Sequence, residues 1–105
     1  MPDPLADTQT LAEQLLAHLR AHEREWRDRY HLQRIGLFGS TARNEATDSS
    51  DVDVWVELAP LTPFATVHLK QELEAVLQRP VDLVRLRERM NPALRQAILQ
   101  EGVSA

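Results

Sequence analysis

The spacing of apolar side chains changes several times along the chain, and each change predicts an element of secondary structure. Leucine and aromatic residues recur every three or four positions over residues 10–30, which is typical of one face of an amphipathic helix. Thr10 and Glu13 have the spacing of a capping box, so this helix is predicted to begin at Thr10. Residues 33–39 then change to the two-residue alternation of a strand.

The clearest strand signal covers residues 51–58. Valine or leucine occupies every second position, and the positions between them are Asp51, Asp53, Trp55 and Glu57. Because successive side chains of a strand point to opposite faces, one face of this strand is predicted to be buried and the other polar. Residues 81–86 predict a third strand, on which Asp82 lies on the face opposite Val81 and Leu83.

Prolines and glycines mark the helices that connect and follow these strands. A short helix is predicted over residues 40–46. A second is predicted over residues 62–78, with Thr62 as its N-cap and a proline as its first residue. A third is predicted over residues 91–101, and Gly102 is its expected stop.

The alternating order of helices and strands predicts an α/β (α+β) fold with a small mixed sheet. The helices are expected on one face, where they bury valine and leucine side chains, and the face that carries the aspartates is expected to be open. A chain of 105 residues has the length of one domain, so residues 1–105 are predicted to form a single domain.

Composition narrows the function classes. The absence of cysteine excludes a disulfide framework and a thiolate metal site. The net charge of −4 argues against a broad basic surface, so no direct nucleic-acid partner is expected. No apolar run approaches the roughly 20 residues that cross a bilayer, and no signal peptide is visible. We therefore expect no membrane partner and a cytoplasmic location.

Charge is unevenly distributed, because residues 44–69 contain five acidic side chains and no lysine or arginine. Asp51 and Asp53 are two positions apart on one strand, so they point the same way with about 6.5–7 Å between their Cα atoms. Carboxylate oxygens are ligands that Mg²⁺ prefers, together with substrate phosphates. Asp82 on the third strand is the natural candidate for a third carboxylate in a two-metal site.

Gly39 and Ser40 stand at the junction of the first strand and the short helix. A glycine lets the backbone approach a phosphate closely, and a serine at a helix start offers both its hydroxyl and its N–H to an anion. Arg43, three residues on, could reach a phosphate or pair with an acid of the following loop. Each motif alone is more often a turn or a solvated loop, but their combination favours a metal-bound nucleoside triphosphate.

The segment LFGSTARNEATDSSDVDVWVEL resembles the nucleotidyltransferase fold of the DNA polymerase beta type. It is most similar to the minimal nucleotidyltransferase (MNT) antitoxins of HEPN/MNT toxin–antitoxin pairs. The family motif G-S-x10-D-x-D and its extension are matched at Gly39, Ser40, Arg43, Ser50, Asp51 and Asp53. The resemblance covers residues 30–103 and includes the later Asp82.

This resemblance implies an antitoxin of a type VII-like system that transfers AMP from ATP, with Mg²⁺, to a tyrosine of a HEPN ribonuclease toxin. The nucleotide-binding residues would be Gly39, Ser40, Arg43 and Ser50. The metal-binding and catalytic residues would be Asp51, Asp53 and Asp82, and Asp82 would also be the general base for the acceptor hydroxyl.

Two alternatives to this function stay open. The antitoxin could be inactive and neutralise the toxin by binding alone. It could also act on a small molecule, although 105 residues leave little surface to enclose one. Trp55 departs from the family pattern, in which a smaller aliphatic residue is usual, and could stack on a nucleobase or crowd the site.

Overall fold

The structure is a computed structural model that describes residues 10–47 and 50–105. Its elements in chain order are α2 (Leu11–Tyr30), β1 (Leu32–Leu37), α3 (Gly39–Ala42), β2 (Val52–Leu58), α4 (Ala65–Leu77), β3 (Val81–Arg85), α5 (Pro92–Glu101) and β4 (Val103–Ser104). The strands form one sheet in the order β3-β2-β1-β4. β1 is antiparallel to β2 and β4, whereas β3 is parallel to β2. The predicted fold class, a mixed sheet with helices, is confirmed.

The start of α2 has the predicted capping box. The Thr10 hydroxyl accepts a hydrogen bond from the Glu13 N–H at 3.1 Å, and the Glu13 carboxylate accepts one from the Thr10 N–H at 3.3 Å. The helix ends at His31, which has a left-handed backbone with φ of 58°. Two of the N–H groups at the start of the helix are therefore paired by side chains. None of the described helices is long and apolar enough to cross a membrane.

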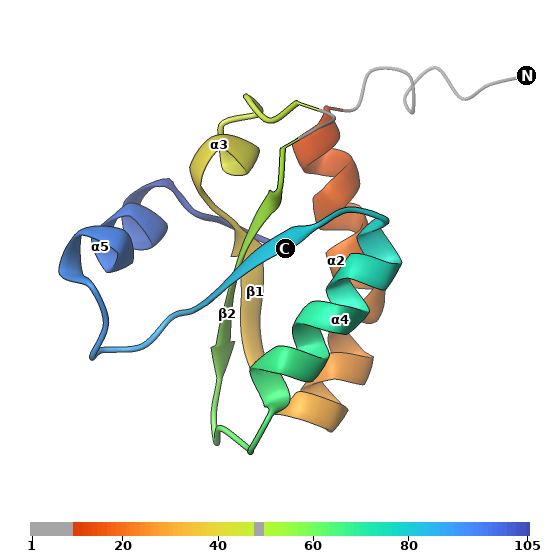
Figure 1. The fold of residues 1–105 in the computed structure, drawn as a ribbon, viewed down its shortest axis with the longest axis vertical. Helices are drawn as coiled ribbons and strands as arrows, with labels where there is room; N and C mark the ends of the chain where they lie inside the picture. Colours follow the sequence, from red (N-terminus) through yellow and green to blue (C-terminus); the bar gives the residue numbers. More distant parts are fainter. Residues whose placement is uncertain (1–9, 48–49) are drawn as a thin grey trace, which may run out of the picture.

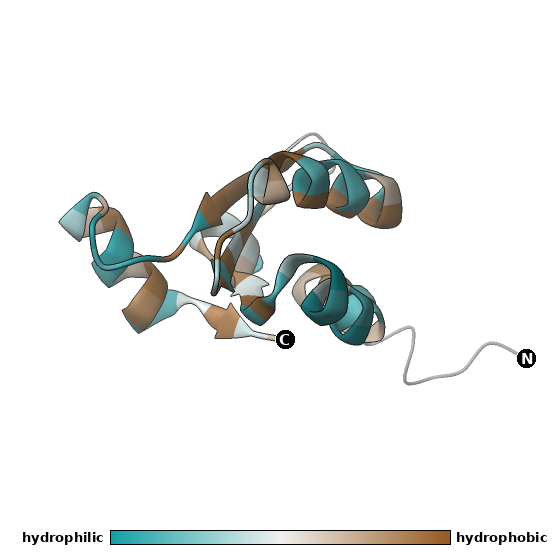
Figure 2. Cartoon of the chain, turned by 90° about the horizontal axis from the view of Figure 1, so that it is seen from below, coloured by the Kyte–Doolittle hydropathy of each residue, from teal (hydrophilic) through white to brown (hydrophobic). Residues whose placement is uncertain are grey.

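The two long helices, α2 and α4, pack side by side on one face of the sheet (Figure 1). In Figure 2 both are banded in hydrophilic and hydrophobic colours, as expected for helices with one face against a core. The fully buried side chains of this core are Leu19, Trp26, Leu32, Ile35, Leu37, Val52, Val54, Val56, Leu69 and Leu73. The valines of β2 lie on the buried face, as their alternation predicts.

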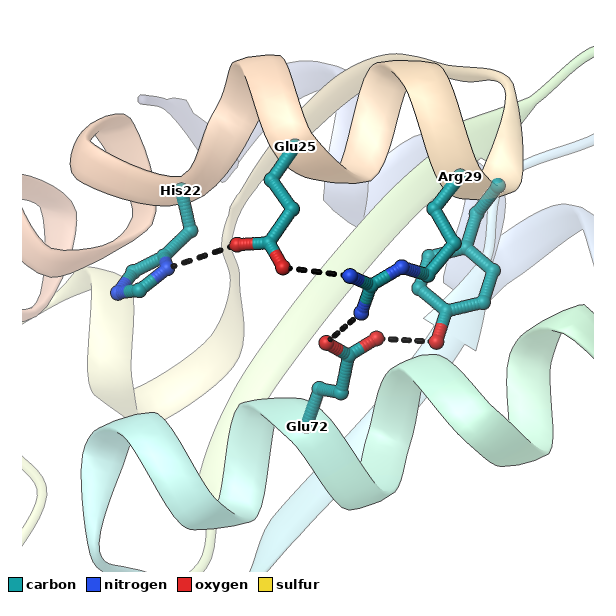
Figure 3. A network of polar contacts seen from close by, with 5 residues as sticks. His22, Glu25, Arg29 and Glu72 are labelled. Atoms are coloured by element: carbon teal, nitrogen blue, oxygen red, sulfur yellow. Dashed lines mark hydrogen bonds and ion pairs between the residues drawn. The ribbon is translucent and has the colours of Figure 1, made fainter.

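A polar network joins α2 to α4 across the edge of this core (Figure 3). The Arg29 guanidinium pairs with Glu25 on its own helix at 2.7 Å and with Glu72 on α4. The hydroxyl of Tyr30, a buried residue, donates a hydrogen bond to the same Glu72 carboxylate. One acidic side chain of α4 therefore fixes two side chains at the end of α2.

The opposite face of the sheet is only partly open, which corrects the expectation of a bare polar face. α5 lies on this side (Figure 1) and packs onto a second apolar cluster made of Phe38, Trp55, Leu86 and Ile98. Trp55 is 3% exposed, so it is a core side chain and does not present its ring to a nucleobase. Apolar residues on α5 made this covering favourable, because Ile98 and its neighbours would otherwise face water.

Two glycines make room for the Trp55 indole. A Cβ at Gly36 would lie 2.6 Å from the indole Nε1 and 2.0 Å from the backbone oxygen of Val103. A Cβ at Gly102 would lie 3.1 Å from the same Nε1. Gly102 follows α5 as predicted, but its φ is −66°, so close packing explains this glycine better than a left-handed helix stop.

The main differences from the sequence-based expectation are the bounds of two helices and one strand that was not predicted. α4 begins at Ala65 and not at Thr62, because Phe64 takes a left-handed backbone with φ of 61° and the Thr62 carbonyl only closes a turn to the Ala65 N–H. α3 stops at Ala42, before the left-handed Asn44. The two-residue strand β4 was missed, since so short a segment has no alternation to detect.

Candidate active site

The predicted phosphate-binding motif and the predicted metal-binding motif are joined by hydrogen bonds through the backbone of Asp53. The Phe38 N–H donates to the Asp53 carbonyl at 3.1 Å. The Asp53 N–H donates in turn to the Thr41 hydroxyl oxygen at 2.9 Å. The end of β1, the turn of α3 and the start of β2 therefore form one unit, in which the position of α3 fixes the position of Asp53.

The Asp53 carboxylate lies directly against the glycine-serine pair. The Ser40 hydroxyl donates a hydrogen bond to Asp53 Oδ2 at 3.4 Å. Gly39 has φ of +58°, and a Cβ on it would stand 2.9 Å from the same oxygen. Glycine is thus required here twice, once for the left-handed backbone and once for the close approach of the carboxylate.

Asp53 and Asp82 are paired in the register of the parallel strands β2 and β3, where neighbouring strands lie about 4.8 Å apart. Burial raises the pKa of the Asp53 carboxyl, and the nearby Asp82 and Asp51 charges raise it further. The Ser40 hydroxyl and a hydrogen bond with the Thr41 backbone partly offset this effect on the pKa. The site therefore concentrates negative charge that a bound cation would relieve.

The three predicted metal ligands, Asp51, Asp53 and Asp82, all lie at this edge of the sheet. Asp53 is half-buried, whereas Asp51, just before β2, and Asp82, on β3, are exposed. Across residues 10–47 and 50–105, no group of three or more acidic or histidine side chains is arranged so that it could hold a metal ion, so the structure does not bring these three carboxylates together as a metal site. A set of carboxylate oxygens without nitrogen or sulfur donors suits Mg²⁺, which also keeps waters and phosphate ligands. The metal assignment stays a prediction.

Arg43 and Ser50 take part in contacts within the chain. The Arg43 guanidinium pairs with Glu45 at 3.1 Å and with Glu101 of α5 at 3.4 Å; these partners, Glu45 first, raise its pKa. Of the two roles predicted for Arg43, pairing with an acid of the loop is the one seen. The Ser50 hydroxyl accepts a hydrogen bond from the Thr47 N–H at 3.1 Å, which closes the loop before Asp51.

One residue of the site was missed by the sequence reading. Thr41 is 1% exposed and holds the Asp53 N–H, yet inside the G-S-T-A-R segment nothing marks its hydroxyl as buried. A hollow of about 80 Å³ lies elsewhere, beside Trp55, Ile98 and Leu99. None of the predicted site residues lines this hollow, so the candidate site is the open edge around Asp53.

The fold and the motif agree with known proteins. The family model described as "Polymerase beta, Nucleotidyltransferase" matches residues 24–104, which include β1, α3, β2, β3 and α5. The chain belongs to this nucleotidyltransferase family. The glycine-serine turn and the aspartates thus lie in the catalytic domain of a nucleotidyltransferase.

Within the nucleotidyltransferase family, this chain is similar to a protein adenylyltransferase and to proteins of toxin–antitoxin complexes. Protein adenylyltransferase MntA of Thermococcus cleftensis is 37% identical over 94 residues, which are 87% of this chain and 92% of the relative. A crystal structure of a toxin-antitoxin with AMP-PNP matches with a TM-score of 0.65 and 31% identity, over 80% of this chain and 69% of that one. A structure of a tri-AMPylated Shewanella oneidensis HEPN toxin in complex with its MNT antitoxin matches with a TM-score of 0.61 and 30% identity, over 86% of this chain and 70% of that one.

Proposed function

We propose that this nucleotidyltransferase is a protein adenylyltransferase that transfers AMP from ATP, with Mg²⁺, to a tyrosine of a HEPN-domain toxin and so acts as its antitoxin. One observation carries the proposal: Ser40 and Thr41 are both hydrogen-bonded to Asp53, which is paired with Asp82 in the register of the next strand. This arrangement can hold a triphosphate and a divalent cation side by side. The adenylyltransferase and toxin-complex relatives support the choice of donor and acceptor.

In this proposal each part of the site has one role. Gly39 and Ser40 would hold the triphosphate, and Arg43 and Ser50 would add further contacts to the nucleotide. Bound Mg²⁺, held by Asp51, Asp53 and Asp82, would neutralise phosphate charge and align the reacting oxygens.

The acceptor must lose a proton as it attacks. Asp82 takes the proton from the tyrosine hydroxyl, whose oxygen forms a new bond to the α-phosphorus of ATP. The bond from that phosphorus to the pyrophosphate oxygen breaks, and pyrophosphate leaves. An exposed carboxylate such as Asp82 is accessible to a protein substrate that approaches the open edge.

The test mixes the purified chain with a HEPN-domain toxin, ATP and Mg²⁺, and measures the intact mass of the toxin. We expect the partner to gain one or more AMP units. An Asp51→Ala/Asp53→Ala variant should modify it at least about a thousandfold more slowly, because a metal supplies several kcal/mol of charge stabilisation. Asp28→Ala, at an exposed acid of α2, is the control. Modification by the double variant at the wild-type rate would show that the metal assignment is wrong.

A second candidate is an antitoxin that acts by binding alone, which is favoured by the solved complexes of toxin and antitoxin among the structural relatives. The same proteins distinguish it. Full inhibition of the toxin by the wild-type chain without ATP, together with no mass change when ATP is added, would favour binding alone.

A further inference from the structure

Apart from aromatic side chains, Thr41 is the only polar or charged residue that is buried among the residues the structure describes, and it is 1% exposed. It belongs to α3, a helix of only four residues, and its hydroxyl oxygen accepts the Asp53 N–H at 2.9 Å. A buried hydroxyl that accepts a hydrogen bond from the backbone of a candidate site residue needs a physical explanation. The register of the sheet provides one.

At the point where β1 ends, the Thr41 hydroxyl takes over the role of a backbone carbonyl as hydrogen-bond acceptor. The last registered pair of β1 and β2 is Leu37 with Val54, so Phe38 stands opposite Asp53. The Phe38 N–H still donates to the Asp53 carbonyl, but the Phe38 carbonyl accepts from the Ala42 N–H at 3.2 Å as α3 begins. In a continued antiparallel pair that carbonyl would accept the Asp53 N–H. The Thr41 hydroxyl takes its place.

The hydrogen bond from the Asp53 N–H to the Thr41 hydroxyl satisfies two requirements that would otherwise conflict. The chain must leave the sheet at Phe38 so that Gly39 and Ser40 can form the turn, yet Asp53 must stay fixed on β2. Without the Thr41 hydroxyl, the Asp53 N–H would lose its acceptor, which favours a shift of the strand start toward another acceptor or water. Such a shift would move the carboxylate away from Ser40 and from its neighbour Asp82.

We propose that Thr41 is a positioning residue of the active site, which holds the Asp53 backbone in place so that the carboxylate can bind the divalent cation that accompanies the nucleotide. The inference deepens the proposed function and rests on it for the identity of cation and nucleotide. Thr41 touches neither ligand in this scheme, and it acts through Asp53. Partners of this kind behind a metal ligand typically contribute 10–100-fold to metal affinity.

The experiment measures binding and needs no toxin. Calorimetric titration of the full chain with AMP-PNP at a series of Mg²⁺ concentrations gives the Mg²⁺ midpoint for nucleotide binding. Thr41→Val keeps the shape of the side chain and removes the hydroxyl, and we expect it to raise the Mg²⁺ midpoint about tenfold. Thr41→Ser restores the hydroxyl and should return the midpoint to within about twofold of the wild type. Thr66→Val, on α4, is the matched control and should leave the midpoint unchanged.

Thermal unfolding of each variant ensures that only folded protein is compared. If Thr41→Val does not fold, Thr41→Ala removes the same hydroxyl from a smaller side chain and replaces it in the titration. A folded Thr41→Val with the wild-type midpoint, or a Thr41→Ser as weak as Thr41→Val, would overturn the inference alone. Wild-type protein that binds AMP-PNP without any dependence on Mg²⁺ would overturn both the inference and the metal part of the proposed function. A normal Mg²⁺ midpoint without AMP transfer to the toxin would remove only the proposed acceptor.

Discussion

The two faces of the central sheet differ in what they bury. The face toward α2 and α4 is mainly apolar, and the three valines that β2 places on it are at most 1% exposed. The face toward α5 is divided along β2, because Asp53 stands at the start of the strand and Trp55 lies two residues further on. On the side of α2 and α4, β2 therefore contributes only core side chains. On the side of α5, it carries the Asp53 carboxylate and, two residues further on, the Trp55 indole.

This difference shows how a small domain can carry a charged site without losing its fold. The helical face supplies most of the apolar burial, so the other face is free to leave aspartates in contact with water. α5 then covers only the part of that face where Trp55 and Leu86 would be exposed. The side chains of β2 that stabilise the fold thus lie on one face of the strand, and the carboxylate of the candidate site lies on the other.

The first prediction tests whether the helical face carries most of the stability. Leu69 on α4 is fully buried, whereas Leu99 on α5 is 48% exposed. Leu69→Ala should lower the free energy of unfolding by about 2–5 kcal/mol, because it leaves a cavity in the core. Leu99→Ala should change it by about 0.5 kcal/mol or less. Urea unfolding measures both variants, and an equal loss at Leu99 would contradict the assignment of stability to the helical face.

The second prediction concerns the packing beneath α5. Gly36→Ala places a Cβ against the Val103 carbonyl and the Trp55 indole, so either β4 or the indole must move. We expect the free energy of unfolding to fall by about 1–3 kcal/mol, which is typical of overpacking. Near-ultraviolet circular dichroism should change at the same time, because the environment of Trp55 is altered. Unchanged stability would mean that this side of the sheet is loosely packed.

The third and smallest effect concerns the charge of Asp53. Because the pKa of this carboxyl is raised in the folded state from its ordinary 3.8, the folded chain holds the proton more tightly than the unfolded chain. That stability is present below the ordinary pKa and is lost as the pH rises through the raised pKa. Asp53→Asn should therefore stabilise the protein at pH 7 without Mg²⁺, by about 0.5 kcal/mol.

Thermal unfolding from pH 3 to pH 8, in the presence of a chelator, measures this effect. The difference in Tm between Asp53→Asn and wild type should shrink as the pH falls toward the ordinary value. Added Mg²⁺ with AMP-PNP should stabilise the wild type more than the variant, because only the wild type retains the carboxylate. If the variant is less stable than wild type at pH 7 without Mg²⁺, the hydrogen bonds of Asp53 outweigh the cost of burying its charge near Asp82 and Asp51.

Much of the fold followed from local patterns. The capping box located the start of α2, and the alternation in β2 located its buried valines, because both signals depend on residues that are close together in the chain. The start of α4 was predicted wrongly, since the left-handed backbone of Phe64 has no signature in its side chain. The covering of Trp55 by α5 was also missed, because it depends on residues more than forty positions apart.

Within the site, the sequence by itself determined the kinds of groups that can meet. It supplied a glycine-serine turn, two aspartates on one strand and a third on another, and their spacing favoured phosphate and metal chemistry. Only the tertiary structure showed that Thr41 completes the sheet where β1 ends and that Arg43 joins α3 to α5. The physical reason is that side-chain direction follows local backbone geometry. Hydrogen-bond partners that are distant in sequence depend instead on which groups the packing of the core brings close together.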